Sequence, residues 1–322
     1  MCADYVRYVV KFKGLPLSDL SWEYWLHIKS DGVEQAEDFW FRQQPPKKIT
    51  ETKHPLLRDF KKLRESPIFG ISSRKKTIAQ LDGNGKPTGR LYEVDAGSTE
   101  NALKLRSYQL EGVNWLLWNW FNKRSCILAD EMGLGKVNSQ NILCFLSPCV
   151  KSFHSRMHLH HHVAMLKLTH LGLLFLLLYF LYPQTIQSMT FLDRLMHMSK
   201  TQVRGPFLIV APLSLVAQWQ SEAATWAPDM NVILYHGSAD AREFLVKQEF
   251  YYTDQFVPKA DASKLKRQNV TKFHVVVTTY EVAMKDVAVL SRIKWKALIV
   301  DEAHRLKNAT SRLFRDLGGV PR

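Results

Sequence analysis

Residues 297–304 read Ala-Leu-Ile-Val-Asp-Glu-Ala-His, a short apolar run that ends in two carboxylates. An apolar run of this length predicts a strand that is buried on both faces of a sheet. A nucleoside triphosphatase needs one acid in such a place to hold Mg²⁺ and a second to orient the attacking water. Asp301 is the candidate for holding Mg²⁺, and Glu302 is the candidate for orienting the water. An acidic helix N-cap is the structural alternative.

A phosphate-binding loop is predicted upstream, where Asp130-Glu-Met-Gly-Leu-Gly-Lys follows the apolar run Cys126–Ala129. In the pattern G-x-x-x-x-G-K-[ST], backbone N–H groups and the lysine surround phosphates, and the hydroxyl holds Mg²⁺. Gly133 and Gly135 permit the tight loop and Lys136 supplies the cation, while Asp130 stands where the pattern has its first glycine. A glycine-containing turn without a ligand is the alternative.

The order of apolar segments predicts the fold class. Residues 106–120 carry apolar side chains at helical spacing. Short apolar runs bounded by turns are expected as further strands: Phe207–Ala211, Val232–Tyr235, His274–Thr278 and Ala297–Val300. Strands that alternate with helix-length segments favour an α/β domain, in which helices cover a parallel sheet.

Six motifs in order resemble the Swi/Snf-like helicase-type ATPases, and most of all the chromodomain (CHD) remodelers. They lie at residues 105–116, 127–136, 211–219, 235–238, 277–281 and 301–308. The resemblance covers residues 105–136 and 185–317. It implies an α/β fold with a RecA-like parallel sheet flanked by helices, the first lobe of a two-lobed helicase.

The resemblance also implies roles for individual residues. Gln109 would read the adenine of ATP and Lys136 would bind its β- and γ-phosphates. Asp301 would hold Mg²⁺ and Glu302 would serve as catalytic base. Four residues would lie along the DNA backbone, in contacts that position a protein without reading base sequence: Pro212, Ser214, Thr278 and Thr279.

The N-terminal residues are similar to the core of a chromodomain, with Tyr8-Val-Val-Lys-Phe-Lys-Gly-Leu followed by Ser-Trp-Glu at 21–23. Such modules can hold methyl-lysine in an aromatic cage. Phe12 stands where the cage usually has Trp, and Leu15 stands where it often has an aromatic residue. We therefore expect a structural or histone- and DNA-contacting module, and not a methyl-lysine reader. The predicted organisation is a partial chromodomain over 1–44, a basic linker over 45–104 and the ATP-binding lobe over 105–322.

Residues 137–184 interrupt the phosphate loop. The family has Thr-Ile-Gln-Ser directly after Gly-Lys, whereas here Val137 follows Lys136 and Thr185 resumes the motif 48 residues later. A transmembrane helix over 163–182, a genuine insertion and a retained intron are open interpretations. Metal binding is a further one, by His158, His160, His161 and His162. The intron is favoured, because Val-Asn can encode a splice donor, Gln an acceptor, and the Leu/Phe/Tyr run a pyrimidine-rich tract.

The interruption has a chemical consequence whatever its origin. Val137 offers no hydroxyl to Mg²⁺, and Thr185 recovers that role only if the insert loops out of the phosphate site. We expect the 322-residue chain to be inactive as an ATPase and the 274-residue form without the insert to bind ATP. We also expect slow hydrolysis from this form, since the second lobe with its arginine finger lies outside the sequence.

Composition favours a globular protein with a polyanionic partner. The 46% hydrophobic and 23% charged residues exclude a wholly disordered or collagen-like chain. Lysine and arginine number 44 against 30 acidic residues, a net charge of +14 that falls to +11 without the insert. The basic linker, and a polar loop expected to contain Lys264, Lys266 and Arg267, are candidates for phosphate contacts.

The leading hypothesis is an ATP-dependent chromatin remodeler of the nucleus, with ATP and Mg²⁺ as cofactors. Duplex DNA, nucleosomes with their histones and remodeler-complex subunits are the expected partners. No membrane association is expected, because the apparent span lies in the insert. The alternatives are an RNA helicase, suggested by the literal Asp-Glu-Ala-His, a non-catalytic chromatin-binding isoform, and a membrane-anchored protein.

Overall fold

The computed structural model describes residues 6–12, 15–46, 68–69, 75–95, 103–128, 142–145, 183–197, 203–268 and 270–302. The chain divides into two compact units. The N-terminal unit comprises residues Met1–Ile49, Phe69–Ala102 and Tyr235–Phe273, and the sheet unit comprises Thr50–Ile68, Leu103–Leu234 and His274–Arg322. The phosphate loop at 130–136 lies outside the described residues.

A six-stranded sheet forms the centre of the sheet unit, in the order β10-β11-β9-β12-β8-β7. Strand β9 pairs in parallel with both β11 and β12, and every residue of these three strands is buried. This arrangement confirms the predicted α/β class. The strands are β7 (Cys126–Leu128), β8 (Ile142–Phe145), β9 (Phe207–Ala211), β10 (Val232–Tyr235), β11 (Val275–Thr279) and β12 (Ala297–Val300).

Strand β8 belongs to the insert. It lies between β12 and β7 and runs antiparallel to both, with Cys144 opposite Ile299 on one side and Cys126 on the other. Residues 142–145 of the insert are therefore part of the sheet, which the prediction of a disruptive insert did not foresee, and its last two residues, Pro183 and Gln184, begin α5. The histidine cluster and residues 163–182 lie outside the described residues.

The part of the chain that the structure describes holds neither a candidate membrane span nor a candidate metal cluster, and the insert residues predicted for either lie outside that part. Among the helices that the structure describes, none is long and apolar enough to cross a membrane. In the described ranges, no group of three or more His, Cys, Asp or Glu residues is placed to hold a metal ion.

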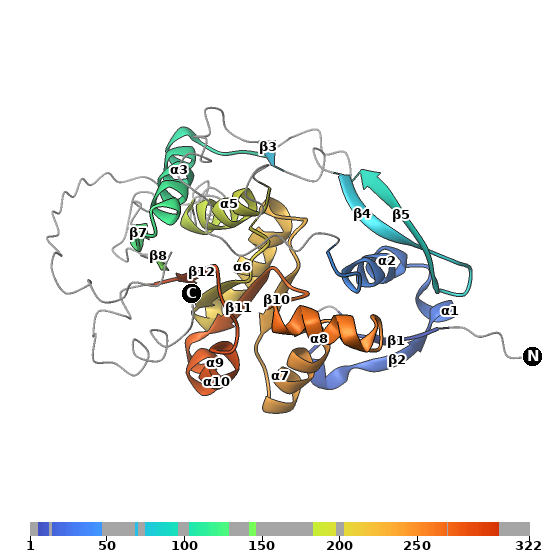
Figure 1. The fold of residues 1–322 in the computed structure, drawn as a ribbon. Helices are drawn as coiled ribbons and strands as arrows, with labels where there is room; N and C mark the ends of the chain where they lie inside the picture. The colour runs from blue at the N-terminus through green and yellow to red at the C-terminus, as the bar shows by residue number, and fades with distance from the viewer. Residues whose placement is uncertain are drawn as a thin grey trace, which may run out of the picture. The chain divides into compact units, whose positions relative to one another are not determined.

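Helices surround the strands of the sheet unit, with α3 and α5 above them and α9 and α10 below them in Figure 1. Helix α3 was predicted from its spacing, and Val113, Leu117 and Trp120 are buried as expected. It packs closely on α5, since a Cβ atom added at Gly112 would lie 2.4 Å from Nε2 of Gln187. The helices are α3 (Ser107–Phe121), α5 (Pro183–His197), α6 (Leu213–Trp226), α9 (Tyr280–Lys285) and α10 (Val287–Leu290).

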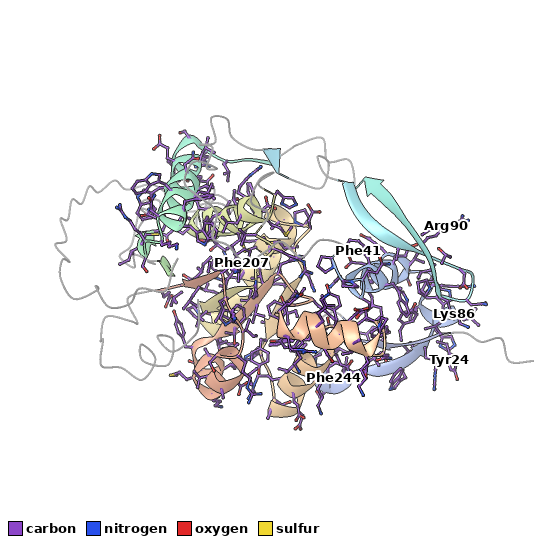
Figure 2. The ribbon with its side chains drawn as sticks, in the orientation of Figure 1. Tyr24, Phe41, Lys86, Arg90, Phe207 and Phe244 are labelled. Carbon is purple, nitrogen blue, oxygen red and sulfur yellow. The ribbon has the colours of Figure 1, made fainter. Side chains whose placement is uncertain are left out.

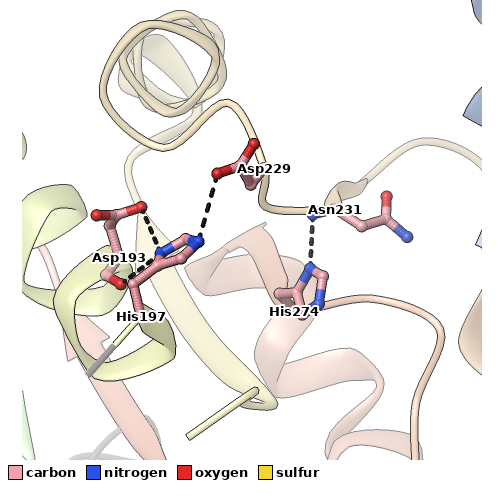
Figure 3. Close-up of polar contacts among 5 residues, drawn as sticks. All are labelled: Asp193, His197, Asp229, Asn231 and His274. Atoms are coloured by element: carbon pink, nitrogen blue, oxygen red, sulfur yellow. Dashed lines mark hydrogen bonds and ion pairs between the residues drawn. The ribbon is translucent and has the colours of Figure 1, made fainter. Parts of the chain in front are cut away.

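Two histidines hold the ends of these elements in place (Figure 3). His197, at the end of α5, lies between two carboxylates, with Nδ1 3.2 Å from Asp193 and Nε2 3.3 Å from Asp229. His274 accepts a hydrogen bond from the backbone N–H of Asn231 at its Nδ1, at 2.8 Å. Because Asp229 and Asn231 both lie between α6 and β10, this connection is tied to α5 and to the start of β11.

The N-terminal unit begins with the antiparallel pair β1 (Arg7–Val10) and β2 (Ser21–Tyr24). A second hairpin, β4 (Lys75–Leu81) and β5 (Pro87–Asp95), lies inside the stretch predicted as linker. Its turn is held by Asp82, whose Oδ1 accepts from the N–H groups of Asn84 and Lys86. Gly85 has φ +78° and approaches the Trp25 ring so closely that a Cβ atom would clash.

The other elements of this unit are short. They are the 3₁₀ turn Leu17–Asp19, α1 (Trp25–Ile28), α2 (Val33–Arg42), α7 (Ala239–Leu245), the π-helical turn Val246–Phe250 and α8 (Lys259–Arg267). Two further strands have two residues each: β3 (Ile68–Phe69) begins in the sheet unit, and β6 (Leu103–Lys104) belongs to that unit. The expectation of a loop at 264–267 is wrong, because these residues form the last turns of α8, which buries Ala262 and Leu265.

An aromatic and charged cluster joins α2 to residues 246–273 within the N-terminal unit. Phe39 and Trp40 make edge contacts with Phe256. Lys272 is 2% exposed, and its Nζ donates to Gln43 Oε1 at 2.6 Å and to a backbone carbonyl at 2.7 Å. Burial lowers the pKa of Lys272, and the nearby Glu249 carboxylate opposes this lowering.

Figure 2 shows the contrast between the interior and the surface of the units. Phe207 of β9 lies fully inside the sheet unit, with no exposed surface. Tyr24, Lys86 and Arg90 project outward from the N-terminal unit. The alternation of exposed and half-buried residues along β1 and β2 follows from the two-residue period of a strand.

Candidate functional site

The site is built around Asp301, the residue that follows β12. Its backbone N–H donates to the carbonyl of Val210 at 2.9 Å, which continues the pairing of β12 with β9 by one residue. Asp301 is 2% exposed, and both of its carboxylate oxygens accept hydrogen bonds. Oδ2 accepts from the indole N–H of Trp219 at 2.9 Å, and Oδ1 accepts from the backbone N–H of Glu302 at 2.8 Å.

Glu302 adopts a backbone conformation that is unusual for its residue type. Its φ is +48°, in the left-handed region. A residue with a Cβ atom pays roughly 1–2 kcal/mol there, and strain of this kind is concentrated at functional sites. The bend lets the N–H of Glu302 reach the Asp301 carboxylate, and the half-buried Glu302 side chain starts beside that carboxylate.

Helix α6 carries the first pair of predicted DNA-contact residues. Pro212 is buried and stands at the N-cap, where its carbonyl accepts from the N–H of Leu215 at 2.9 Å. Ser214 is exposed, and Leu213 is 59% exposed. The N-terminal turn of α6 is therefore open to solvent, with the hydroxyl of Ser214 and free helix N–H groups available to an anion.

The second predicted pair lies at the end of β11. Thr278 and Thr279 are 0% and 1% exposed. The hydroxyl of Thr279 accepts from the N–H of Val282 at 3.3 Å and so caps α9. The next residue, Tyr280, donates its hydroxyl to the backbone carbonyl of Asp301. The hydroxyl of Thr279 thus has a structural partner inside the fold.

The predicted nucleotide residues outside β12 lie on two helices. Thr185 is 4% exposed in the first turn of α5. Gln109 is 7% exposed on α3, and its Oε1 accepts from the N–H of Arg106 at 2.9 Å, as part of a capping box. The loop residues lie outside the described residues: Asp130, Gly133, Gly135 and Lys136.

The atoms around Asp301 suit Mg²⁺, which prefers oxygen ligands. A carboxylate has about four lone-pair positions. The hydrogen bonds from Trp219 and Glu302 each use one of these positions on Asp301. The Asp301 carboxylate and the Thr185 hydroxyl are both oxygen donors of the kind that this metal takes.

One carboxyl group on α6 has a shifted pKa. Burial raises the pKa of Glu222 above its ordinary value, and a hydrogen bond with Trp226 opposes the rise. Because the pKa of Glu222 is higher in the folded chain than in the unfolded chain, protonation of this carboxyl at low pH favours the folded state. This contribution is lost as the pH rises through the raised pKa.

Sequence reasoning assigned no role to Trp219 or Tyr280, although both stand in motifs that it quoted. Both side chains are buried and donate a hydrogen bond to Asp301. The available signal was their chemistry, since a buried Trp or Tyr usually finds a partner for its polar atom. Their partner is far away in the sequence, and no local spacing points to it.

The positions predicted for a methyl-lysine cage lie at the surface of the N-terminal unit. Phe12 is 47% exposed and Leu15 is 46% exposed. On β1 and β2, the guanidinium of Arg7 lies 5.9 Å from the ring centroid of Trp22 and 5.6 Å from that of Tyr24. The cation that contacts these two exposed rings is therefore Arg7 of this chain.

Comparison with known proteins finds the profile of the SNF2-related domain over residues 108–318. The chain is 32% identical over 314 residues to human chromodomain-helicase-DNA-binding protein 6, an alignment of 98% of this chain and 8% of that protein. It is 31% identical over 315 residues to chromodomain-helicase-DNA-binding protein 8 of Xenopus tropicalis, across 97% of this chain and 10% of that protein. The chain thus spans a tenth or less of the length of these relatives.

A search of solved structures finds the SWI2/SNF2 ATPase core of Sulfolobus solfataricus in complex with dsDNA. The sequence identity is 18% and the TM-score is 0.39, over 68% of this chain and 30% of that chain.

The cap at α9 can be tested by replacing Thr279. Thr279→Ala removes a buried methyl group and also the hydroxyl that accepts from the N–H of Val282. We therefore expect the free energy of unfolding to fall by about 1–2 kcal/mol. Thr279→Ser keeps the hydroxyl and should lose less than half of that. Urea unfolding measures both variants, and a Thr279→Ala protein as stable as wild type would show that the cap contributes nothing.

Proposed function

The chain belongs to the SNF2-related domain family, and we propose on that premise that residues 105–322 form the ATP-binding lobe of a DNA-dependent ATPase that acts on chromatin. The observation that carries the proposal is the buried Asp301 carboxylate at the end of β12, with Glu302 directly beside it. Two adjacent carboxylates at the end of a buried strand are what a metal-dependent phosphoryl-transfer site requires.

Within this site the residues take separate roles. Asp301 and Thr185 would hold Mg²⁺, Lys136 would bind the β- and γ-phosphates, and Gln109 would contact the adenine. When bound, Mg²⁺ supplies positive charge that offsets the charge on the phosphate oxygens. Glu302 orients the attacking water and accepts its proton. The loop from Asp130 through Gly133 and Gly135 would supply backbone N–H groups to the phosphates, as the sequence pattern predicts.

The insert decides whether this site can work in the chain as written. Lys136 is followed by Val137, which has no oxygen for Mg²⁺. Deleting 137–184 places Thr185 directly after Lys136 and restores the phosphate-loop pattern. The deletion also removes β8 from between β7 and β12. The proposal is that the 274-residue form binds Mg²⁺-ATP and the 322-residue chain does not.

Nucleotide binding by the two purified forms tests this proposal. With a slowly hydrolysed fluorescent ATP analogue, we expect Mg²⁺-dependent binding by the 274-residue form and at least about tenfold weaker binding by the 322-residue chain, a difference of about 1.4 kcal/mol. Lys136→Ala and Asp301→Asn in the 274-residue form are matched controls, and both should lose the Mg²⁺-dependent component of nucleotide binding. Equal Mg²⁺-dependent binding by both forms would refute the effect of the insert.

Duplex DNA is the proposed partner of the open N-terminal turn of α6. The chain has a net charge of +14, which favours a polyanion. Ser214 is exposed at the start of a 14-residue helix, where N–H groups and the helix dipole attract phosphate. The predicted contacts at Thr278 and Thr279 would have to involve backbone groups, or follow a local rearrangement, because both side chains are buried.

A charge placed at this turn separates DNA binding from folding. Ser214→Glu adds a carboxylate where phosphate is proposed to lie, while an acid in the first turn of a helix favours folding by about 0.3–1 kcal/mol. We expect several-fold weaker binding to duplex DNA with no loss of thermal stability. Fluorescence anisotropy at about 50 and about 200 mM salt measures the affinity and its salt dependence.

The matched control for this variant is Ser221→Glu, which makes the same change at another exposed position of α6. If both variants lose the same affinity, the loss reflects net charge alone and the contact at Ser214 is refuted. Duplex RNA of the same sequence distinguishes the RNA-helicase alternative, since that alternative requires RNA to bind at least as well as DNA.

Nucleosomes, histones and remodeler-complex subunits are proposed as further partners, and the nucleus as the location. Support comes from the alignment across 97–98% of the chain with chromodomain-helicase-DNA-binding proteins. Residues 1–44 are proposed as a partial chromodomain and 45–104 as the connection to the lobe. A non-catalytic chromatin-binding isoform is the second candidate, and the insert after Lys136 is the observation that favours it.

A further inference from the structure

Two aromatic side chains donate hydrogen bonds to Asp301 that the proposed roles of the site residues do not explain. Trp219 Nε1 donates to Oδ2 at 2.9 Å, and the Tyr280 hydroxyl donates to the backbone carbonyl. The two aromatic residues are 1% and 2% exposed. An indole N–H can only donate, so the interaction of Trp219 with the carboxylate has a fixed sense.

The two donors come from the two segments proposed to lie along DNA. Trp219 stands six residues after Leu213 on α6, which places it about 9 Å along the helix from the open turn at about 1.5 Å per residue. Tyr280 directly follows Thr279 and begins α9. Each proposed DNA-contact segment is therefore joined to Asp301 by one side chain.

This geometry makes Asp301 sensitive to the position of α6. A displacement of one end of a 14-residue helix also moves the indole in its middle. Hydrogen bonds weaken steeply as donor and acceptor lose alignment. Groups that hydrogen-bond a metal-ligating side chain fix its orientation, and their loss typically lowers metal affinity about 10–100-fold.

We propose that Trp219 and Tyr280 are positioning residues that make the Mg²⁺ affinity of the nucleotide site depend on duplex DNA bound at α6 and at the end of β11. The inference rests on the proposed function and adds a physical connection to it. DNA contact at α6 holds the indole N–H in the position against Asp301 that the structure shows, and it lowers the Mg²⁺ concentration that nucleotide binding requires. By linkage, Mg²⁺-nucleotide tightens DNA binding by the same factor.

The hydrogen bond itself is tested in the full 322-residue chain without nucleotide. A double-mutant cycle of Trp219→Phe and Asp301→Ala should show a coupling of about tenfold in the unfolding equilibrium constant, as for hydrogen bonds to charged groups. Trp295→Phe is the matched control, because Trp295 is also 1% exposed and donates its indole N–H to the carbonyl of Leu290 at 2.9 Å. Its cycle with Asp301→Ala should be additive. Additivity of the Trp219 cycle would overturn the proposal.

The positioning role is tested by Mg²⁺ titration of ATP-analogue binding, with and without duplex DNA, in whichever form binds nucleotide. In the wild-type protein, DNA should lower the half-saturating Mg²⁺ concentration about fivefold or more. Trp219→Phe should raise that concentration about tenfold and abolish the effect of DNA. Tyr280→Phe, which removes only the hydroxyl, should reduce the effect, and Trp295→Phe should leave it unchanged.

The half-saturating Mg²⁺ concentration does not depend on the fraction of folded protein, so a merely structural role would leave it at the wild-type value. If wild-type protein of either form shows no Mg²⁺-dependent binding, the proposed function fails and this inference fails with it. If wild-type protein binds and Trp219→Phe keeps the wild-type Mg²⁺ dependence, the inference is overturned while the proposed function stands. An absence of any DNA effect in wild-type protein overturns the connection to DNA.

Discussion

The hydrogen bond from Trp219 to Asp301 is the interaction on which the arrangement of the candidate site depends. Asp301 is 2% exposed, and a buried carboxylate is costly unless donors surround it. The fold supplies these donors from α6 and from the N–H of Glu302, while Tyr280 holds the backbone carbonyl. The hydrogen bonds to this one residue, to its carboxylate from α6 and to its backbone carbonyl from α9, thus join β12 to both helices.

The buried strands explain why the sheet unit was predictable. Strands β9, β11 and β12 are buried along their whole length, so their sequences are continuous apolar runs with turns at both ends. Such runs need no tertiary information to be recognised. Helix α3 was equally clear, since its buried face repeats at helical spacing. The prediction of an α/β domain followed from these segments and is confirmed.

Other elements were missed because their local signals were ambiguous. Asn84-Gly85 is a strong hairpin signal, but it stands among basic residues and was interpreted as a break in a linker. Helix α8 buries only Ala262 and Leu265, too few apolar residues to stand out from a polar loop. Strand β8 is defined by its pairing with β7 and β12. Neither partner strand adjoins β8 in the sequence, and a local sequence pattern does not reveal pairing of this kind.

The candidate site divides in the same way. The adjacent carboxylates at Asp301 and Glu302 were identified from their place after an apolar run, because the chemistry and the local structure coincide there. The contributions of Trp219 and Tyr280 depend on contacts across 82 and 21 residues, which only the fold establishes. Thr279 was predicted to contact DNA, but its side chain is buried and its hydroxyl caps α9.

The most direct test of the central role of Trp219 is the NMR spectrum of protein with ¹⁵N-labelled tryptophan indoles. The sequence has nine tryptophans, and the Trp219 signal is the one that disappears in Trp219→Phe. The account predicts that this signal has the shift of a hydrogen-bonded indole, moves when Asp301 is replaced by Ala, and moves again when duplex DNA is added to wild-type protein. A Trp219 signal that is the same in the Asp301→Ala protein and unaffected by DNA would contradict it.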